Sequence, residues 1–168
     1  MIEYIKLFFI ALVLAFLQAF IIQEVDMGFW MRPMPYLMLF MVLPVNINKY
    51  AQLIIAFVFG TFIDLLSGSF GTHAASCVFM VFIKNLIDHR FVDFDSIQLQ
   101  GENYINIDTK GQLFFTYYTI SLIFIHHFVF FSLDFFEWVR FFRILGTTLF
   151  STLGSYLLVL LYKSIFRR

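Results

Sequence analysis

The most informative stretch of the chain is GTFIDLLSGSFGTHA, residues 60–74. It joins two apolar blocks, residues 51–66 and 70–87, through Ser67-Gly68-Ser69, with Gly71 just inside the second block. Serine and glycine at this density are typical of a turn. Because each block is near the ~20 residues that a helix needs to cross ~30 Å of hydrocarbon, the stretch predicts a hairpin of two membrane helices.

Asp64 stands inside this hairpin, and a carboxylate within an apolar span is costly unless it has a partner or a function. It follows Ala56 and Gly60 at four-residue intervals, which places two small residues and the carboxylate on one helix face. The free N–H groups at the start of the next helix suit a carboxylate. We therefore expect Asp64 to accept hydrogen bonds there, with His73 as a further partner. The alternative is a proton or ligand site, which would need a second ionisable group within the membrane.

The composition of the whole chain excludes a water-soluble domain. Of its 168 residues 61% are apolar and 13% charged, against about half and a quarter in soluble domains. Lys plus Arg and Asp plus Glu balance at 11 each, so no nucleic-acid partner is expected and the lipid bilayer is the natural surroundings. Six apolar blocks cover residues 5–22, 29–45, 51–66, 70–87, 113–133 and 142–162. The sequence predicts an all-α integral membrane protein, a single domain of about six transmembrane helices in one bundle.

The second block, residues 29–45, contains Pro33, Pro35 and Pro44. Proline is tolerated in the first turn of a helix and disrupts its interior. Pro33 and Pro35 therefore mark the entry, and a short helix is expected from Pro35 to residue 45, crossing at a tilt or only in part. The first block is longer than the apolar region of a usual signal peptide, and we interpret it as an uncleaved helix.

The distribution of Lys and Arg next to helix ends predicts the orientation. With six spans and an inside N-terminus, eight of these residues fall inside and three outside. Both termini and the polar loop 88–111 are therefore expected in the cytoplasm. Within this loop residues 97–107 partly alternate in polarity, which fits either a small hairpin with a partner or a disordered segment.

The last two blocks carry further polar residues. His126 and His127 are adjacent, so they point about 100° apart on a helix and do not form the i, i+4 pair usual in metal sites. We expect one of them to face neighbouring helices and the other an interface. Thr147, Ser151 and Ser155 recur every four residues and form a face of small side chains. This face is expected to pack inside the bundle; docking against another membrane protein is the alternative.

No catalytic motif is present. The chain lacks a phosphate-binding loop, a dinucleotide-binding Gly-x-Gly-x-x-Gly, a Gly-x-Ser-x-Gly elbow and a His-Glu-x-x-His pair. The only cysteine, Cys77, lies in an apolar run and is interpreted as a packing residue. We therefore expect no enzymatic activity, no cofactor and no metal.

Residues 60–74 resemble the signature of the MreD family, the rod-shape-determining membrane proteins of bacteria, in which the pattern G-x-x-x-D-x-x-S-G-x-x-G-x-H-A joins two membrane helices. The matching residues are Gly60, Asp64, Ser67, Gly68, Gly71, His73 and Ala74. The entry at residues 33–37, the length, the six spans and the cytoplasmic termini are also similar to the family. The abundance of Phe and the stretch His126-His127-Phe128 resemble a Bacteroidota-type member.

The resemblance implies a non-enzymatic scaffold of the cell-elongation (rod) complex in the bacterial inner membrane, needed for rod shape and directed peptidoglycan synthesis. Its implied partners are MreC, the actin-like MreB, RodA and a class B penicillin-binding transpeptidase. The family is also similar in fold to the substrate-binding subunits of energy-coupling-factor vitamin transporters, and such a subunit is the alternative function. That function needs a pocket with several inward polar groups under a long outer loop. The outer loops predicted here are short, so the scaffold is favoured.

Overall fold

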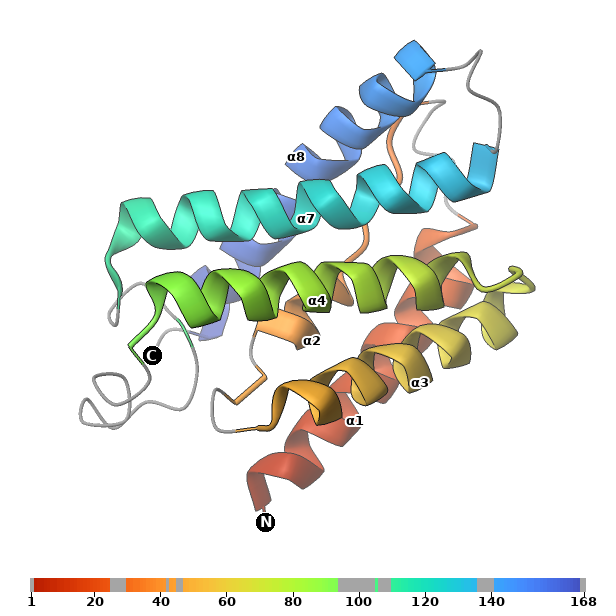
Figure 1. Ribbon diagram of the computed structural model, residues 1–168. Helices are drawn as coiled ribbons and strands as arrows, with labels where there is room; N and C mark the ends of the chain where they lie inside the picture. The colour runs from red at the N-terminus through yellow and green to blue at the C-terminus, as the bar shows by residue number, and fades with distance from the viewer. Residues whose placement is uncertain are drawn as a thin grey trace.

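The computed structural model describes residues 2–24, 30–41, 43–44, 47–93, 105, 110–135 and 141–166. Within these residues all regular secondary structure is helical, which confirms the predicted all-α class. The elements are α1 (Ile2–Leu17), its π-helical continuation η1 (Gln18–Ile22), α2 (Leu37–Met41), α3 (Lys49–Ser67), α4 (Thr72–Phe91), α7 (Gln112–Phe135) and α8 (Phe141–Phe166) (Figure 1).

Three helices are long and apolar enough to cross a membrane, namely α3, α7 and residues 141–161 of α8. The apolar part of α1 and η1, Leu7–Ile22, is shorter. Helix α4 matches the predicted block 70–87 but carries charged residues in its last third. These lengths and compositions identify a membrane protein.

The long helices form a sequence of packed neighbours: α3 packs on α4, α4 on α7, and α7 on α8. Helix α1 crosses α3 at an angle (Figure 1), and the rings of Phe16 and Phe62 meet edge to face between them. The starts of α1 and α3 and the ends of α4 and α8 lie together (Figure 1). We call this the Lys49 end of the bundle, and the opposite end, with the α3–α4 turn and the start of α8, the Asp64 end. Helix α2 lies between the long helices, where Leu37 and Phe40 are fully buried.

The second apolar block contains only a short helix, as its prolines predicted, but this helix begins at Leu37 and not at Pro35. Residues 31–34 are non-helical, a turn follows at Pro35 and Tyr36, and α2 has only five residues. The residue before a proline is disfavoured in the helical region, and Pro33 and Pro35 apply this restriction twice in three residues. The extended part lies against α8, where the ring of Trp30 closely approaches Gly146 and Met31 approaches Gly154.

This buried extended segment has few backbone N–H groups to satisfy. Between residues 32 and 35, Pro33 and Pro35 have none, and the N–H groups of Arg32 and Met34 bind serines of α8. The N–H of Arg32 donates to Ser151 Oγ at 2.9 Å, and that of Met34 donates to Ser155 Oγ at 2.8 Å. Irregular backbone at membrane depth is tolerated only where it is buried in protein and its polar groups are paired. The two prolines remove two N–H groups, and Ser151 and Ser155 accept the N–H groups of Arg32 and Met34.

The boundary of the predicted polar loop 88–111 also changes. Helix α4 continues to Phe91, so Asp88 belongs to the helix and is buried. The helix continues because Asp88 pairs with Lys84, one turn before it. The small hairpin considered at residues 97–107 lies outside the described residues, apart from Ile105.

Candidate functional site

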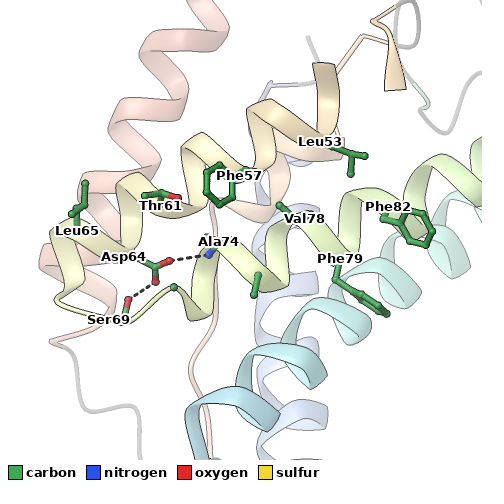
Figure 2. Close-up of a pocket in the computed structure, with 12 residues that line it drawn as sticks. Leu53, Phe57, Thr61, Asp64, Leu65, Ser69, Ala74, Val78, Phe79 and Phe82 are labelled. Atoms are coloured by element: carbon green, nitrogen blue, oxygen red, sulfur yellow. Dashed lines mark hydrogen bonds between the residues drawn. The ribbon is translucent and has the colours of Figure 1, made fainter. Parts of the chain in front are cut away.

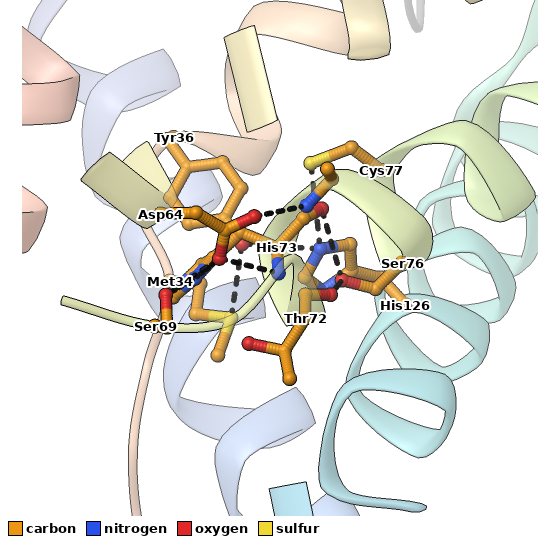
Figure 3. A network of polar contacts seen from close by, with 10 residues as sticks. Met34, Tyr36, Asp64, Ser69, Thr72, His73, Ser76, Cys77 and His126 are labelled. Atoms are coloured by element: carbon orange, nitrogen blue, oxygen red, sulfur yellow. Dashed lines mark hydrogen bonds and ion pairs between the residues drawn. The ribbon is translucent and has the colours of Figure 1, made fainter. Parts of the chain in front are cut away.

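The carboxylate of Asp64 closes the turn between α3 and α4 (Figures 2 and 3). Its Oδ1 accepts hydrogen bonds from Ser69 Oγ at 2.5 Å and from the His73 N–H at 3.0 Å. Its Oδ2 accepts the N–H of Ala74 at 2.9 Å. These are the contacts expected from the sequence, and the residue is 4% exposed. Asp64 thus supplies from the preceding helix the cap that the glycine at the start of α4 cannot provide.

Two glycines shape this turn. Gly68 ends α3 in the left-handed conformation at φ 67°, and Gly71 precedes α4 at φ 82°. The Ser69 N–H then returns to the Asp64 carbonyl at 3.0 Å, as is common after a left-handed helix end. Ser67 is the last residue of α3, and its hydroxyl has no hydrogen-bond partner among the described residues. Gly68, Ser69 and Gly71 therefore build the turn around Asp64.

Gly60 brings the two helices into backbone contact below the turn. A Cβ atom at this position would lie 2.5 Å from Ala74 Cα and 2.9 Å from the His73 carbonyl oxygen. No side chain larger than hydrogen fits there without moving α4. Gly60, Asp64 and Ala74 therefore act as one packed unit, with the small residue allowing the approach that the carboxylate then fixes.

The ring of His73 turns back toward the same carboxylate. Its Nδ1 lies 2.9 Å from Asp64 Oδ1 and 3.1 Å from Ser69 Oγ. A nitrogen that close to a carboxylate oxygen carries a proton, so Nδ1–H is the donor. The other side of the ring packs on Phe130 of α7, with ring centroids 4.7 Å apart. Ser69 is the further side chain that binds the Asp64 carboxylate, and the sequence analysis did not name it as a site residue. Its signal in the sequence is a hydroxyl group five residues after Asp64.

A second polar group lies deeper in the bundle, around His126 (Figure 3). His126 Nε2 lies 3.1 Å from the Tyr36 hydroxyl and 3.7 Å from Cys77 Sγ. The neighbouring His127 contacts Ser155 Oγ through Nε2 at 3.3 Å and the Ile123 carbonyl through Nδ1 at 2.8 Å. Both histidines are fully buried, which corrects the expectation that one faces an interface. Tyr36, directly before α2, and Cys77 of α4 cover His126, and Ser155 of α8 covers His127.

The face of small side chains on α8 is covered by the chain itself. Thr147, Ser151 and Ser155 are all buried, and the two serines bind the backbone of residues 32–34. The hydroxyl of Thr147 has no partner among the described residues. Packing inside the bundle, the first of the two interpretations, is what the structure shows for this face.

A third polar cluster, at the Lys49 end, was missed in the sequence. The Lys84 ammonium donates to Asp88 Oδ2 at 2.6 Å and contacts Gln52 Oε1 at 3.4 Å. The Tyr118 hydroxyl donates to Asp88 Oδ1 at 2.8 Å. Lys84 and Asp88 are 2% and 3% exposed, so this is a buried ion pair linking α3, α4 and α7. The orientation predicted from the sequence includes Lys84 among the eight basic residues inside, and its i, i+4 spacing from Asp88 is the signal for an ion pair.

Most donors and acceptors in these clusters are paired with one another, whereas His126 Nδ1 has no hydrogen-bond partner among the described residues. Among the residues that the structure describes, no three His, Cys, Asp or Glu side chains gather as metal ligands. The polar side chains chiefly join helices. Their hydrogen bonds and ion pairs satisfy polar groups that would otherwise be unpaired in an apolar interior.

Comparison of the chain with models of protein families, with curated proteins and with solved structures gives no match.

Proposed function

We propose that this chain is a non-enzymatic scaffold of the bacterial cell-elongation complex, related to the MreD family and located in the inner membrane. The observation that carries the proposal is the Asp64 turn. Its residues have the spacing of the family signature, and each of them except Ser67 has a visible structural task in the turn. Residues that build a rigid hairpin are expected in a protein whose function is to bind other proteins through its surfaces.

The buried polar groups support a structural role for the charged residues. Asp64 accepts hydrogen bonds from both the backbone and side chains, and Lys84 is paired with Asp88. A transport or catalytic role would use a group that can exchange its partner with a substrate or a proton. The scaffold proposal instead assigns these groups to holding three helices in register, so that the exposed apolar faces of the bundle meet lipid or partner helices.

The proposed topology is multi-pass with both termini in the cytoplasm. It is supported by the excess of Lys and Arg in the segments assigned inside and by the position of the starts of α1 and α3 at one end of the bundle. We assign the second crossing to the described part of the segment between η1 and α3, residues 30–41 and 43–44. It passes from the start of α8, at Gly146, toward Ser155 and then through α2.

The test is purification of a C-terminally tagged chain from its native membrane in a gentle detergent, with identification of the co-purifying proteins by mass spectrometry. Recovery of MreC with RodA and the transpeptidase, and of MreB, is the expected result. Recovery of two ATPases and a coupling membrane subunit would contradict the scaffold and assign the chain to the vitamin-transporter class.

A further inference from the structure

Helix α8 is held in the bundle by two neighbours. Among the described helices, only α7 forms an extensive contact with it. Its other neighbour is the extended segment of residues 31–34, which we call the strap. Two backbone hydrogen bonds hold the strap on α8, and the side chain of Met31 closely approaches Gly154 of the same helix. The packing of α8 therefore depends in part on a segment that is not helical.

The chain directly after the strap is fixed to the other long helices instead. Tyr36 is fully buried, and its ring lies against Phe59 of α3 and His73 of α4. Its hydroxyl lies 3.1 Å from His126 Nε2 of α7 (Figure 3). Only Pro35 separates Tyr36 from the strap. The strap therefore connects α8 to a group formed by α3, α4, α7 and the Tyr36 side chain.

The Ser155 hydroxyl joins the strap to both neighbouring helices. His127 Nδ1 lies 2.8 Å from the Ile123 carbonyl oxygen, which can only accept, so Nδ1 carries the proton of this ring. The other nitrogen, Nε2, is then an acceptor, and Ser155 Oγ donates to it at 3.3 Å. The same hydroxyl oxygen accepts the N–H of Met34. One chain of hydrogen bonds thus runs from the strap through α8 to α7.

The strap has no acceptors for its backbone without α8. An N–H group that loses its acceptor inside a bilayer is costly, because no water replaces the lost partner. The acceptors of Arg32 and Met34 lie 119 and 121 residues later in the chain. The extended path of the strap therefore becomes stable only after α8 has entered the membrane.

We propose that the strap is a latch, which closes on α8 only when α8 is in place and opens as a unit of its own while α3 and α4 stay packed. In the closed state the strap covers Ser151 and Ser155, and in the open state this face of α8 is uncovered. Segments held by few hydrogen bonds open separately from the helices that they join. The latch is independent of the elongation partners named above.

The experiment is hydrogen–deuterium exchange of the full chain in detergent micelles, with fragmentation that resolves single backbone amides. Arg32 and Met34 are informative because each of their N–H groups donates to one serine of α8. Combining Ser151→Ala with Ser155→Ala should raise the exchange rate at both amides at least about fivefold, the ratio that corresponds to one net hydrogen bond. The amides of α3 and α4 are expected to keep their rates.

The matched control removes two other hydroxyl groups from the same helix. Thr148 and Thr152 are buried, and their hydroxyls have no hydrogen-bond partner among the described residues. Thr148→Val combined with Thr152→Val is therefore expected to leave the exchange rates at Arg32 and Met34 unchanged. Equal effects of the two double variants, or unchanged exchange in the serine variant, would overturn the latch.

The unaltered chain provides a second measurement if the serine variant does not fold. Exchange is followed in mixed micelles with increasing dodecyl sulfate, which loosens the bundle stepwise. The amides of Arg32 and Met34 are expected to lose protection at a lower dodecyl sulfate content than those of α3 and α4. Simultaneous loss of protection in all these segments would show that the strap does not open separately, and would overturn the latch.

Discussion

The two ends of α4 hold buried charge in different ways. At its start the Asp64 carboxylate is stabilised by two backbone N–H groups and two side chains that follow within ten residues. Near its end Asp88 is stabilised by an opposite charge on Lys84 and by Tyr118, 30 residues further along the chain. The first arrangement is local and uses the backbone of the helix. The second is a tertiary arrangement, and removing one partner leaves the other charge buried in an apolar interior.

The largest effect is expected from separating the buried ion pair. Asp88→Leu leaves the Lys84 ammonium without its counter-charge and should lower the free energy of unfolding by about 3–5 kcal/mol. Combining it with Lys84→Met should restore most of that loss, because an apolar pair of similar volume is often neutral. Unfolding in mixed micelles with increasing dodecyl sulfate measures the free energy of unfolding of the single and the double variant. If the double variant is no more stable than the single one, the ion pair is not what makes Asp88 important.

A smaller effect is expected at the start of α4. Asp64→Asn keeps the shape but replaces the charged acceptor that caps the helix, and should cost about 1.5–3 kcal/mol, the value of hydrogen bonds to a charged group. The same unfolding assay measures it. Asp134→Asn, a partly exposed carboxylate at the same end, is the control. Equal losses in the two variants would mean that the contacts to the α4 backbone contribute little.

The close approach of α3 and α4 is tested by two glycines. Gly60→Ala places a methyl group 2.5 Å from Ala74 Cα, which is backbone, and should cost about 1–3 kcal/mol through separation of the helices. Gly154→Ala meets the flexible end of Met31 and should be close to neutral, since alanine is also the better helix former. A neutral Gly60→Ala in the unfolding assay would show that the helices separate without cost.

The smallest effect is expected at the exposed ion pair. Arg32 and Asp134 lie 3.3 Å apart with side chains 59% and 35% exposed. Exposed pairs contribute less than about 1 kcal/mol, so Arg32→Gln should shift the unfolding transition little, and less at high salt. A loss as large as that of Asp88→Leu would remove the distinction between buried and exposed charge.

The local character of the Asp64 turn explains why it could be predicted from the sequence. Its donors lie 5, 9 and 10 residues from the carboxylate, so the order of residues alone brings them together. The partners of the Lys84–Asp88 pair come from α3 and α7, 32 and 30 residues away, and no local pattern marks them. The cluster could therefore be identified only from the packing of α3, α4 and α7 in the structure.

The path of the second apolar block, residues 29–45, could not be predicted from the sequence for a different reason. Its composition is that of a membrane helix, and its prolines predicted a short helix from Pro35 to residue 45. The extended path of residues 31–34 depends on hydroxyl groups that Ser151 and Ser155 supply from the last helix. The small-residue face of α8 was found as a pattern, but its occupant was a segment more than 100 residues earlier in the chain.

We propose that the buried charge in this chain holds the helices of a scaffold together and takes no part in transport or catalysis. The most direct test compares tagged wild-type chain and Asp64→Asn in native membranes, measuring the folded amount and the recovery of MreC, RodA and the transpeptidase from the same preparation. The account predicts that partner recovery falls only in proportion to the folded amount. Unchanged folding and assembly together with the loss of a transport activity would contradict it.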